Sequence, residues 1–168
     1  MDSKQVVAVA SAVVLIVILV YPALSTGPVS VVVKSAEIKD AEHVYVTISH
    51  IWVHKGSQAS FEGWNLLSNQ TQTLDLVTLT NASQVLGRAD VSLGDYDTIR
   101  IEISNVTWTF NNTTSKLQVE TSLLPAPVDF TVRAGKETVI VLVLTGQQKQ
   151  VQDTKFFVAS LNATLSQS

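Results

Sequence analysis

Three histidines lie close together in the chain and are the first residues to consider as metal ligands. They are His43, His50 and His54, and Glu42 adds a carboxylate beside the first of them. In an extended strand, His50 and His54 are about 13 Å apart between their Cα atoms, whereas zinc needs ligand atoms at about 2 Å. The chain has no HExxH motif and no cysteine. We therefore expect strand histidines with no bound metal and no cofactor.

Two aspartates, Asp95 and Asp97, flank Tyr96 directly after Gly94. Paired carboxylates can bind calcium, but an acidic turn at the surface has the same composition, and we expect the turn. The chain has neither a GxSxG elbow for a serine nucleophile nor a glycine-rich phosphate loop. These features predict a protein without catalytic residues.

Three tryptophans, Trp52, Trp64 and Trp108, offer aromatic surfaces on which a sugar can stack. Trp108 continues an alternating apolar series, so we expect it in the core. Trp52 is out of phase with its apolar neighbours Ile51 and Val53, which predicts a position at the surface or against a neighbouring side chain. A carbohydrate platform is one alternative that these residues leave open.

The elements that must position these residues are β-strands. Apolar and polar residues alternate in segments rich in Val, Ile and Thr, and turn residues recur every eight to twelve positions. Without a crossover helix, this pattern predicts a mainly β fold, an antiparallel β-sandwich of Greek-key, immunoglobulin-like type with nine or ten strands. The expected strands span residues 29–38, 44–54, 63–67, 72–79, 88–93, 96–110, 115–120, 128–132, 138–144 and 156–165.

The connections between these strands can also be predicted. We expect hairpins about Gly94–Asp95 and Ala134–Gly135, and a rigid crossing at Pro125–Pro127. The apolar phase shifts by one residue after Ile48 and again after Ile103, which predicts β-bulges near Ser49–His50 and Ser104–Asn105. The run VIVLVL at residues 139–144 has no polar face, so we expect a central strand covered on both sides.

A hydrophobic segment precedes these strands. Residues 6–24 carry no charge and would span roughly 28 Å as a helix, close to the ~30 Å hydrocarbon core of a bilayer. We expect residues 1–25 to be a membrane anchor whose helix contacts lipid, and residues 26–168 to be one extracellular domain. A cleaved secretory signal and a pilin-like helix cut before Val6 are the alternatives. The anchor residues are Val6, Val13, Leu15, Ile16, Ile18 and Leu19.

The asparagines give the strongest compositional signal. Six of the seven begin an Asn-x-Ser/Thr sequon, and only Asn65 does not. Such density predicts N-glycans and therefore an exported domain, although a Thr-rich β protein would carry some sequons by composition alone. The expected glycosylation sites are Asn69, Asn81, Asn105, Asn111, Asn112 and Asn162.

Several blocks occur in an order that resembles a known family. They are VYVTISHIWVHK, GWNLL, TLDLVTL, LGRADVSLGDYDTIRIEISNVT and VDFTVRAGKETVIVLVL. Over roughly residues 29–163 the chain is similar to the domain of unknown function 4382, although Gly94–Asp95 replaces that family's usual small turn such as Ala-Gly. The resemblance implies an exported β-domain, often anchored to membrane or lipid, and brings no catalytic residues.

These observations predict a non-catalytic, glycosylated cell-surface protein that forms part of the envelope, an adhesive layer or a filament. A sugar- or metal-binding accessory module and a surface enzyme similar to the camelysin type are the alternatives. The net charge is −3, with no basic patch, so nucleic acid is not an expected partner. The expected partners are further copies of the chain, in a homo-oligomer or filament, or other envelope proteins. Assembly by strand lending would use Val29, Val31 and Val33.

Overall fold

The computed structural model describes residues 25–59 and 61–166 of the chain. Within this part, no helix has the length and apolar character needed to cross a membrane. The expected membrane anchor stays a prediction, because its residues lie outside those described. These residues are Val6, Val13, Leu15, Ile16, Ile18 and Leu19.

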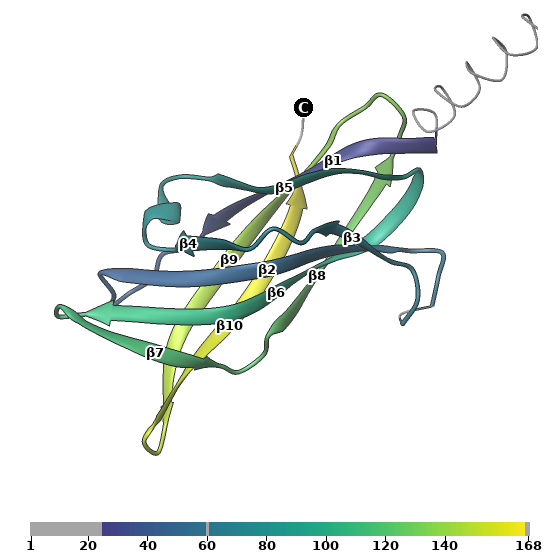
Figure 1. The fold of residues 1–168 in the computed structure, drawn as a ribbon. Coiled ribbons are helices and arrows are strands. Elements are labelled where there is room, and N and C mark those ends of the chain that lie inside the picture. The colour runs from purple at the N-terminus through teal and green to yellow at the C-terminus, as the bar shows by residue number, and fades with distance from the viewer. Residues whose placement is uncertain (1–24, 60, 167–168) are drawn as a thin grey trace, which may run out of the picture.

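Ten β-strands and one 3₁₀ turn make up the described chain (Figure 1). This confirms the mainly β fold that alternation predicted. The strands are β1 (Thr26–Ser35), β2 (His43–Lys55), β3 (Trp64–Ser68), β4 (Gln72–Asp75), β5 (Gln84–Ser92), β6 (Gly94–Phe110), β7 (Thr113–Val119), β8 (Leu123–Val132), β9 (Thr138–Val151) and β10 (Thr154–Leu165), and the turn η1 spans Thr78–Thr80.

The strands form one curled and nearly closed sheet. Its hydrogen-bonded order is β3-β2-β6-β7-β10-β9-β1-β5, with β4 also paired to β2 and β8 to β6. Most neighbours are antiparallel, as predicted, but β1 is parallel to β9 and β10 is parallel to β7. The prediction of a purely antiparallel sandwich is therefore wrong in its pairing. The parallel contact of β10 with β7 joins the two halves of the sheet.

Strand β6 is the longest element and contacts three neighbours. It pairs with β2 along most of its length, with β8 through its first half and with β7 through its second half. The register against β2 skips Ser49 and Ser104, which confirms both predicted bulges. Each bulge lets the side chains on either side of it keep facing the core while the strand bends.

Two predicted hairpins are wrong. Strand β5 pairs with β1, and β6 pairs with β2, β7 and β8, so the turn at Gly94 carries the chain from one half of the sheet to the other. Gly94 has φ 131°, which a residue with a side chain rarely adopts. Likewise β8 pairs with β6 and β9 with β1 and β10, leaving one isolated bridge, Arg133–Lys136, at the second turn.

Pro125 and Pro127 lie within β8 and do not form a separate crossing. They pair with Arg100 and Thr98 of β6. Proline fits there because β8 has only one paired neighbour, so the missing N–H groups need not break a ladder on the other edge. Both prolines point outward, since Leu124, Ala126 and Val128 between and beside them are buried.

The core lies inside the curled sheet and contains alternate residues of every long strand. In β9, Ile140, Leu142 and Leu144 are fully buried, but the intervening valines at 139, 141 and 143 are only half-buried. The prediction that this run is central is confirmed, because β9 lies between β1 and β10. The prediction of cover on both faces is wrong, since the outer face is partly open.

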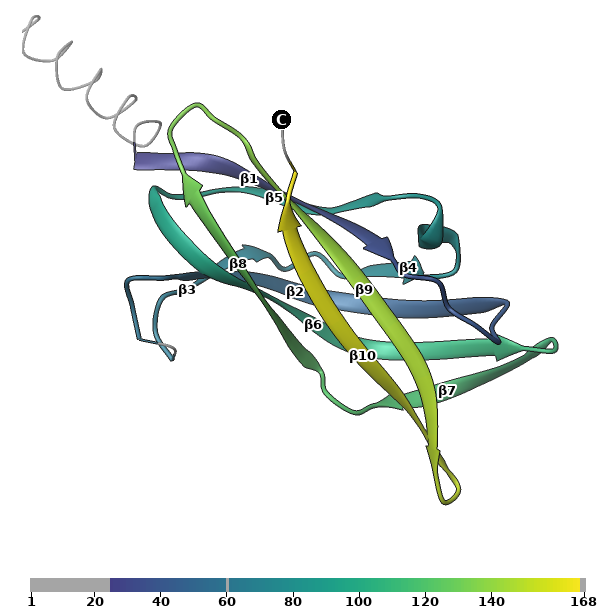
Figure 2. The ribbon, with the colours of Figure 1, turned by 180° about the vertical axis from the view of Figure 1, so that it is seen from behind.

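The far ends of β9 and β10 extend beyond β7 (Figures 1 and 2). These two strands pair over twelve positions. Gly146 of β9 lies against the ring of Phe157, which occupies the space that a Cβ at this position would need. Because Phe157 is fully buried, glycine is required here by close packing.

We predict that Ile101→Ala and Leu142→Ala each lower the free energy of unfolding by about 2 to 5 kcal/mol, because both side chains are completely buried and truncation leaves a cavity. Chemical denaturation measures the change. The matched control is Val85→Ala, whose side chain is largely exposed and whose loss should cost less than about 0.5 kcal/mol. Equal losses at the three positions would contradict this description of the core.

Candidate functional site

Each of the three histidines contacts one carboxylate. Nδ1 of His43 lies 2.7 Å from Asp75, Nδ1 of His50 lies 2.7 Å from Glu102, and Nδ1 of His54 lies 2.8 Å from Asp97. The two longer-range partners are cross-strand neighbours on β6, brought opposite β2 by the register that the bulges set. Within residues 25–59 and 61–166, no three metal-ligating side chains come together.

The outer face of β2 carries a continuous set of ring contacts. We call His50, Trp52, Arg100, Trp64 and His54 the aromatic stack. Alternation along β2 places its three members on the face opposite the buried Ile51 and Val53, while Arg100 lies across from Trp52 and Trp64 across from His54. The stack therefore joins β3, β2 and β6.

Arg100 is the centre of the aromatic stack. Its guanidinium carbon lies 4.7 Å from the ring centroid of Trp52 and 4.0 Å from that of Trp64. His50 stacks on Trp52 with centroids 5.2 Å apart, and His54 lies 4.9 Å from Trp64. Cation–π contacts of this kind stabilise by about 0.5 to 2 kcal/mol each, depending on solvent exposure.

The tryptophans do not form an open sugar platform. A sugar ring stacks on an uncovered aromatic face, whereas the guanidinium of Arg100 lies over Trp52 and Trp64. Trp108 is not part of the aromatic stack. It is buried in the core, as predicted, and its Nε1 donates a hydrogen bond to the carbonyl oxygen of Asp40. The off-phase position of Trp52 thus marks packing against neighbouring side chains, which was one of its two predicted outcomes.

Both nitrogens of the buried His54 ring face acceptors. Nδ1 is 2.8 Å from a carboxylate oxygen of Asp97, and Nε2 is 3.1 Å from the carbonyl oxygen of Ala59. Only an imidazolium carries hydrogen on both nitrogens, so both bonds require the charged ring. The bond to Ala59 and the contact with Asp97 raise the pKa of His54 above its ordinary value of 6.5, although burial acts in the opposite direction.

Asp97 is a partner of this buried charge, which corrects the prediction of a solvated acidic turn. Burial alone would raise the pKa of its carboxyl. The hydrogen bonds from His54 and Thr98 outweigh that effect, and the pKa of Asp97 lies below its ordinary value of 3.8. Since Nε2 of His54 is occupied by Ala59, this histidine–aspartate pair has no free lone pair with which to act as a general base.

The loop at residues 56–63 depends on the His54 ring. The hydrogen bond from Nε2 of His54 to the carbonyl oxygen of Ala59 connects the loop to β2. At the two ends of the loop, the amide of Lys55 donates to the carbonyl oxygen of Gly63 at 3.0 Å. The loop carries Phe61, which is 81% exposed. The His54 ring therefore contacts the same loop that carries this exposed aromatic residue.

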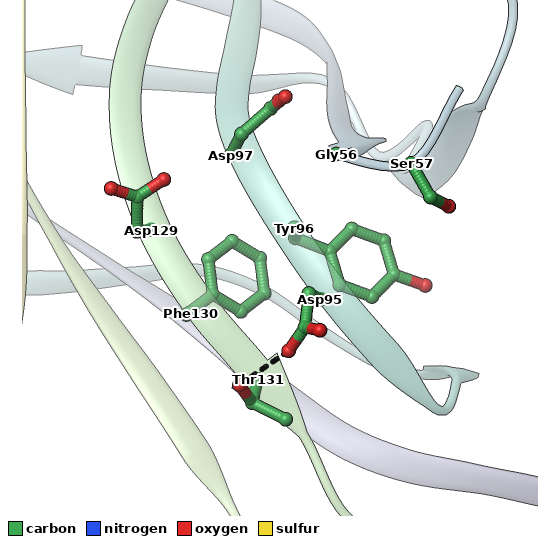
Figure 3. Close-up of a pocket in the computed structure, with 8 residues that line it drawn as sticks. All are labelled: Gly56, Ser57, Asp95, Tyr96, Asp97, Asp129, Phe130 and Thr131. Carbon is green, nitrogen blue, oxygen red and sulfur yellow. Dashed lines mark hydrogen bonds between the residues drawn. The ribbon is translucent and has the colours of Figure 1, made fainter.

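A shallow pocket lies between this loop and strands β6 and β8 (Figure 3). Its lining includes Tyr96 and Phe130, whose largely buried rings stack with centroids 5.1 Å apart. Figure 3 shows the Asp97 carboxylate turned away from those of Asp95 and Asp129. Thr131 donates a hydrogen bond to Asp95 at 2.7 Å. The three carboxylates thus point in different directions and do not converge on one ion.

The predicted glycosylation sites are dispersed over the surface. Asn69 and Asn81 lie in loops, Asn105 in β6, Asn111 and Asn112 at the β6–β7 turn, and Asn162 in β10. All are exposed except Asn105, which is half-buried. Asn111 and Asn112 have φ values of 48° and 59°, a conformation that asparagine tolerates better than most residues. These two asparagines therefore have a turn-forming role besides their sequons.

The predicted donor strand lies inside the sheet. Val29, Val31 and Val33 are fully buried, and β1 pairs with β5 on one edge and β9 on the other. Lending β1 to a neighbour would break both ladders. Strand lending remains a prediction that this arrangement makes costly.

Comparison with known proteins assigns the chain to a family. The chain matches the family described as Domain of unknown function (DUF4382) over residues 26–157, which includes nine of the ten strands and part of β10. It belongs to that family. The match confirms the resemblance seen in the sequence blocks, and it covers the whole aromatic stack of this DUF4382 domain. No curated protein and no solved structure matches the chain.

We predict that part of the stability of this DUF4382 domain depends on pH through His54. Because the pKa of His54 is raised in the folded state, protonated His54 stabilises the fold. This stabilisation is complete below pH 6.5 and is lost as the pH rises through the raised pKa. The lowered pKa of Asp97 stabilises above pH 3.8 and is lost as the pH falls through the lowered value. Alkaline pH should therefore speed hydrogen exchange in the 56–63 loop, after correction for intrinsic rates.

The control variants separate this histidine from the others. His54→Gln should remove the alkaline change in loop exchange, because glutamine does not titrate. His43→Gln should leave the change in place, since His43 pairs with Asp75 at the opposite end of β2. An identical alkaline response in the parent protein and His54→Gln would show that the loop is held in another way.

Proposed function

We propose that this DUF4382 protein is a non-catalytic, glycosylated cell-surface component, anchored by its N-terminal segment and used as a structural subunit of the envelope, an adhesive layer or a filament. The observation that carries the proposal is the distribution of the sequons. Six sequon asparagines occupy exposed or half-exposed positions on loops, one turn, β6 and β10. Glycans can attach at such positions without disturbing the core.

The state of the titratable residues supports a non-catalytic role. The buried His54 has both nitrogens hydrogen-bonded, to Asp97 and to the carbonyl oxygen of Ala59. The sugar-binding alternative has less support because Arg100 covers the indole faces of Trp52 and Trp64. The charge-free segment 6–24 supports anchoring, with residues 26–168 on the outer side of the membrane.

The test is the location and modification of the native protein. We expect protease added to intact cells to digest the β-domain, and mass spectrometry to find glycan on at least Asn69, Asn81 or Asn105. Thr71→Ala and Ser83→Ala should each remove one glycan, because each deletes the hydroxyl residue of a sequon. Asn65, which begins no sequon, is the internal control and should stay bare.

Two results together would refute the proposal. They are protection of the β-domain from protease on intact cells, and unmodified asparagines at every sequon of native material. Activity lost on alanine substitution of a pocket carboxylate, measured against any substrate, would instead favour the surface-enzyme alternative.

A further inference from the structure

The guanidinium of Arg100 is a positioned cation without an anion. It makes no ion pair and no hydrogen bond with any residue that the structure describes, and its Nε is buried with no partner. Trp52 and Trp64 hold the group in place and shield part of it from water. A partly desolvated guanidinium with free donors is best complemented by a carboxylate, which accepts two parallel bonds.

The same outer face also presents a carboxylate. Glu102 follows Arg100 by two positions on β6, so both side chains point outward. Its side chain is 34% exposed, and its carboxylate lies 2.7 Å from His50 and 3.1 Å from Ser49 and makes no ion pair with Arg100. A carboxylate has about four acceptor sites, so Glu102 retains capacity for another donor. One face thus carries an unpaired cation and an available anion.

Apolar side chains surround these charges. Leu66 of β3 is 50% exposed, Leu123 of β8 is 41% exposed, and Pro125 is exposed beside Arg100. No sequon asparagine lies in β2, β3 or β8, and the one in β6, Asn105, lies three residues beyond Glu102, after the bulge at Ser104. Interface centres are enriched in tryptophan and arginine. The combination is that of a docking surface, and packing on it requires Asn105 to carry no glycan.

We propose that a second copy of this chain packs on this surface, related by a two-fold axis that crosses β6 at the level of Ile101. The axis lies between the two sheets and perpendicular to β6, so the two β6 strands face each other and run antiparallel. Arg100 of each copy then meets Glu102 of the other, and Leu123 meets Pro125. A two-fold interface requires such self-complementary pairs. The inference rests on the proposed structural role and names the surface through which the subunit assembles.

The size of the surface fits a weak specific interface. About nine residues each of β2 and β6, five of β3 and six of β8, at about 4.8 Å between strands and ~3.3 Å per residue, give a face of roughly 460 Å². Specific interfaces at the low end bury about 600 Å² per partner. Such a contact suits subunits that are concentrated at one membrane.

Cross-linking of the full-length protein tests the pairing, because the natural chain has no cysteine to interfere. Leu123→Cys and Pro125→Cys variants, one carrying an affinity tag, are mixed in detergent and treated with a short bismaleimide, since packed sheets are about 10 Å apart and too distant for a disulfide. We expect a covalent heterodimer. Thr164→Cys, exposed on β10, is the matched control and should give none with either variant.

Charge reversal tests the ion pair itself. Arg100→Glu or Glu102→Arg alone should abolish the heterodimer, since each places like charges opposite each other twice. A mixture of the two single variants should recover it, because opposite charges then meet across both pairs. Circular dichroism checks that each variant is folded. If a charge reversal unfolds the chain, the test is the cross-link between Leu123→Cys and Pro125→Cys with Arg100 and Glu102 unchanged.

The possible results separate this inference from the proposed function. Absence of the 123–125 cross-link in folded protein, or cross-linking no greater than with Thr164→Cys, overturns the inference and leaves the surface location intact. A cross-link in a protein that proves to be bare of glycan and protected in cells supports the interface and refutes the surface role.

Discussion

Strand β6 is too long for a single neighbouring strand to pair with all of it on each edge. Its seventeen residues lie along β2 on one edge and change from β8 to β7 on the other. The bulge at Ser104 falls near that change of partner, where a straight strand would turn its apolar face away from the core. The curl of the sheet, the burial of Ile101 and Val106 on either side of the bulge, and the outward position of Arg100 all follow from this one constraint.

The register fixed by the bulges also creates the aromatic stack. His54 and Asp97 are 43 residues apart in sequence, yet their strands bring them within hydrogen-bond distance. Arg100 reaches across β2 to Trp64, so one side chain connects three strands on the outer face. The outer surface of this part of the sheet is therefore nearly as constrained as its core, and a change at Arg100 would affect β2, β3 and β6 together.

Period-two alternation made the strands and both bulges predictable, because a phase shift in apolar residues is visible in the sequence around Ser49 and Ser104. Partner choice was not predictable. Adjacent strands usually pair, but β5 and β6, like β8 and β9, are separated by turns that cross between the two halves of the sheet. The parallel pairing of β1 with β9 depends on residues more than 100 positions apart and leaves no local signal.

The role of Asp97 was missed for the same reason. Its neighbours in sequence suggest a turn, whereas its function depends on His54 across the register. A usable signal was present: His50, Trp52 and His54 share the outward phase of β2, and three large side chains on one outer face indicate that something covers them.

The position of β1 determines how the domain would respond to tension. Strand β1 lies at the N-terminal end of the described chain and is held by eight residue pairs with β5 and seven with β9. Hydrogen bonds between strands run nearly perpendicular to the strand axis, more slanted in the parallel pair. A pull along β1 therefore shears both ladders at once and does not peel them apart bond by bond. A domain pulled from this end bears mechanical load through a strand that is held on both edges.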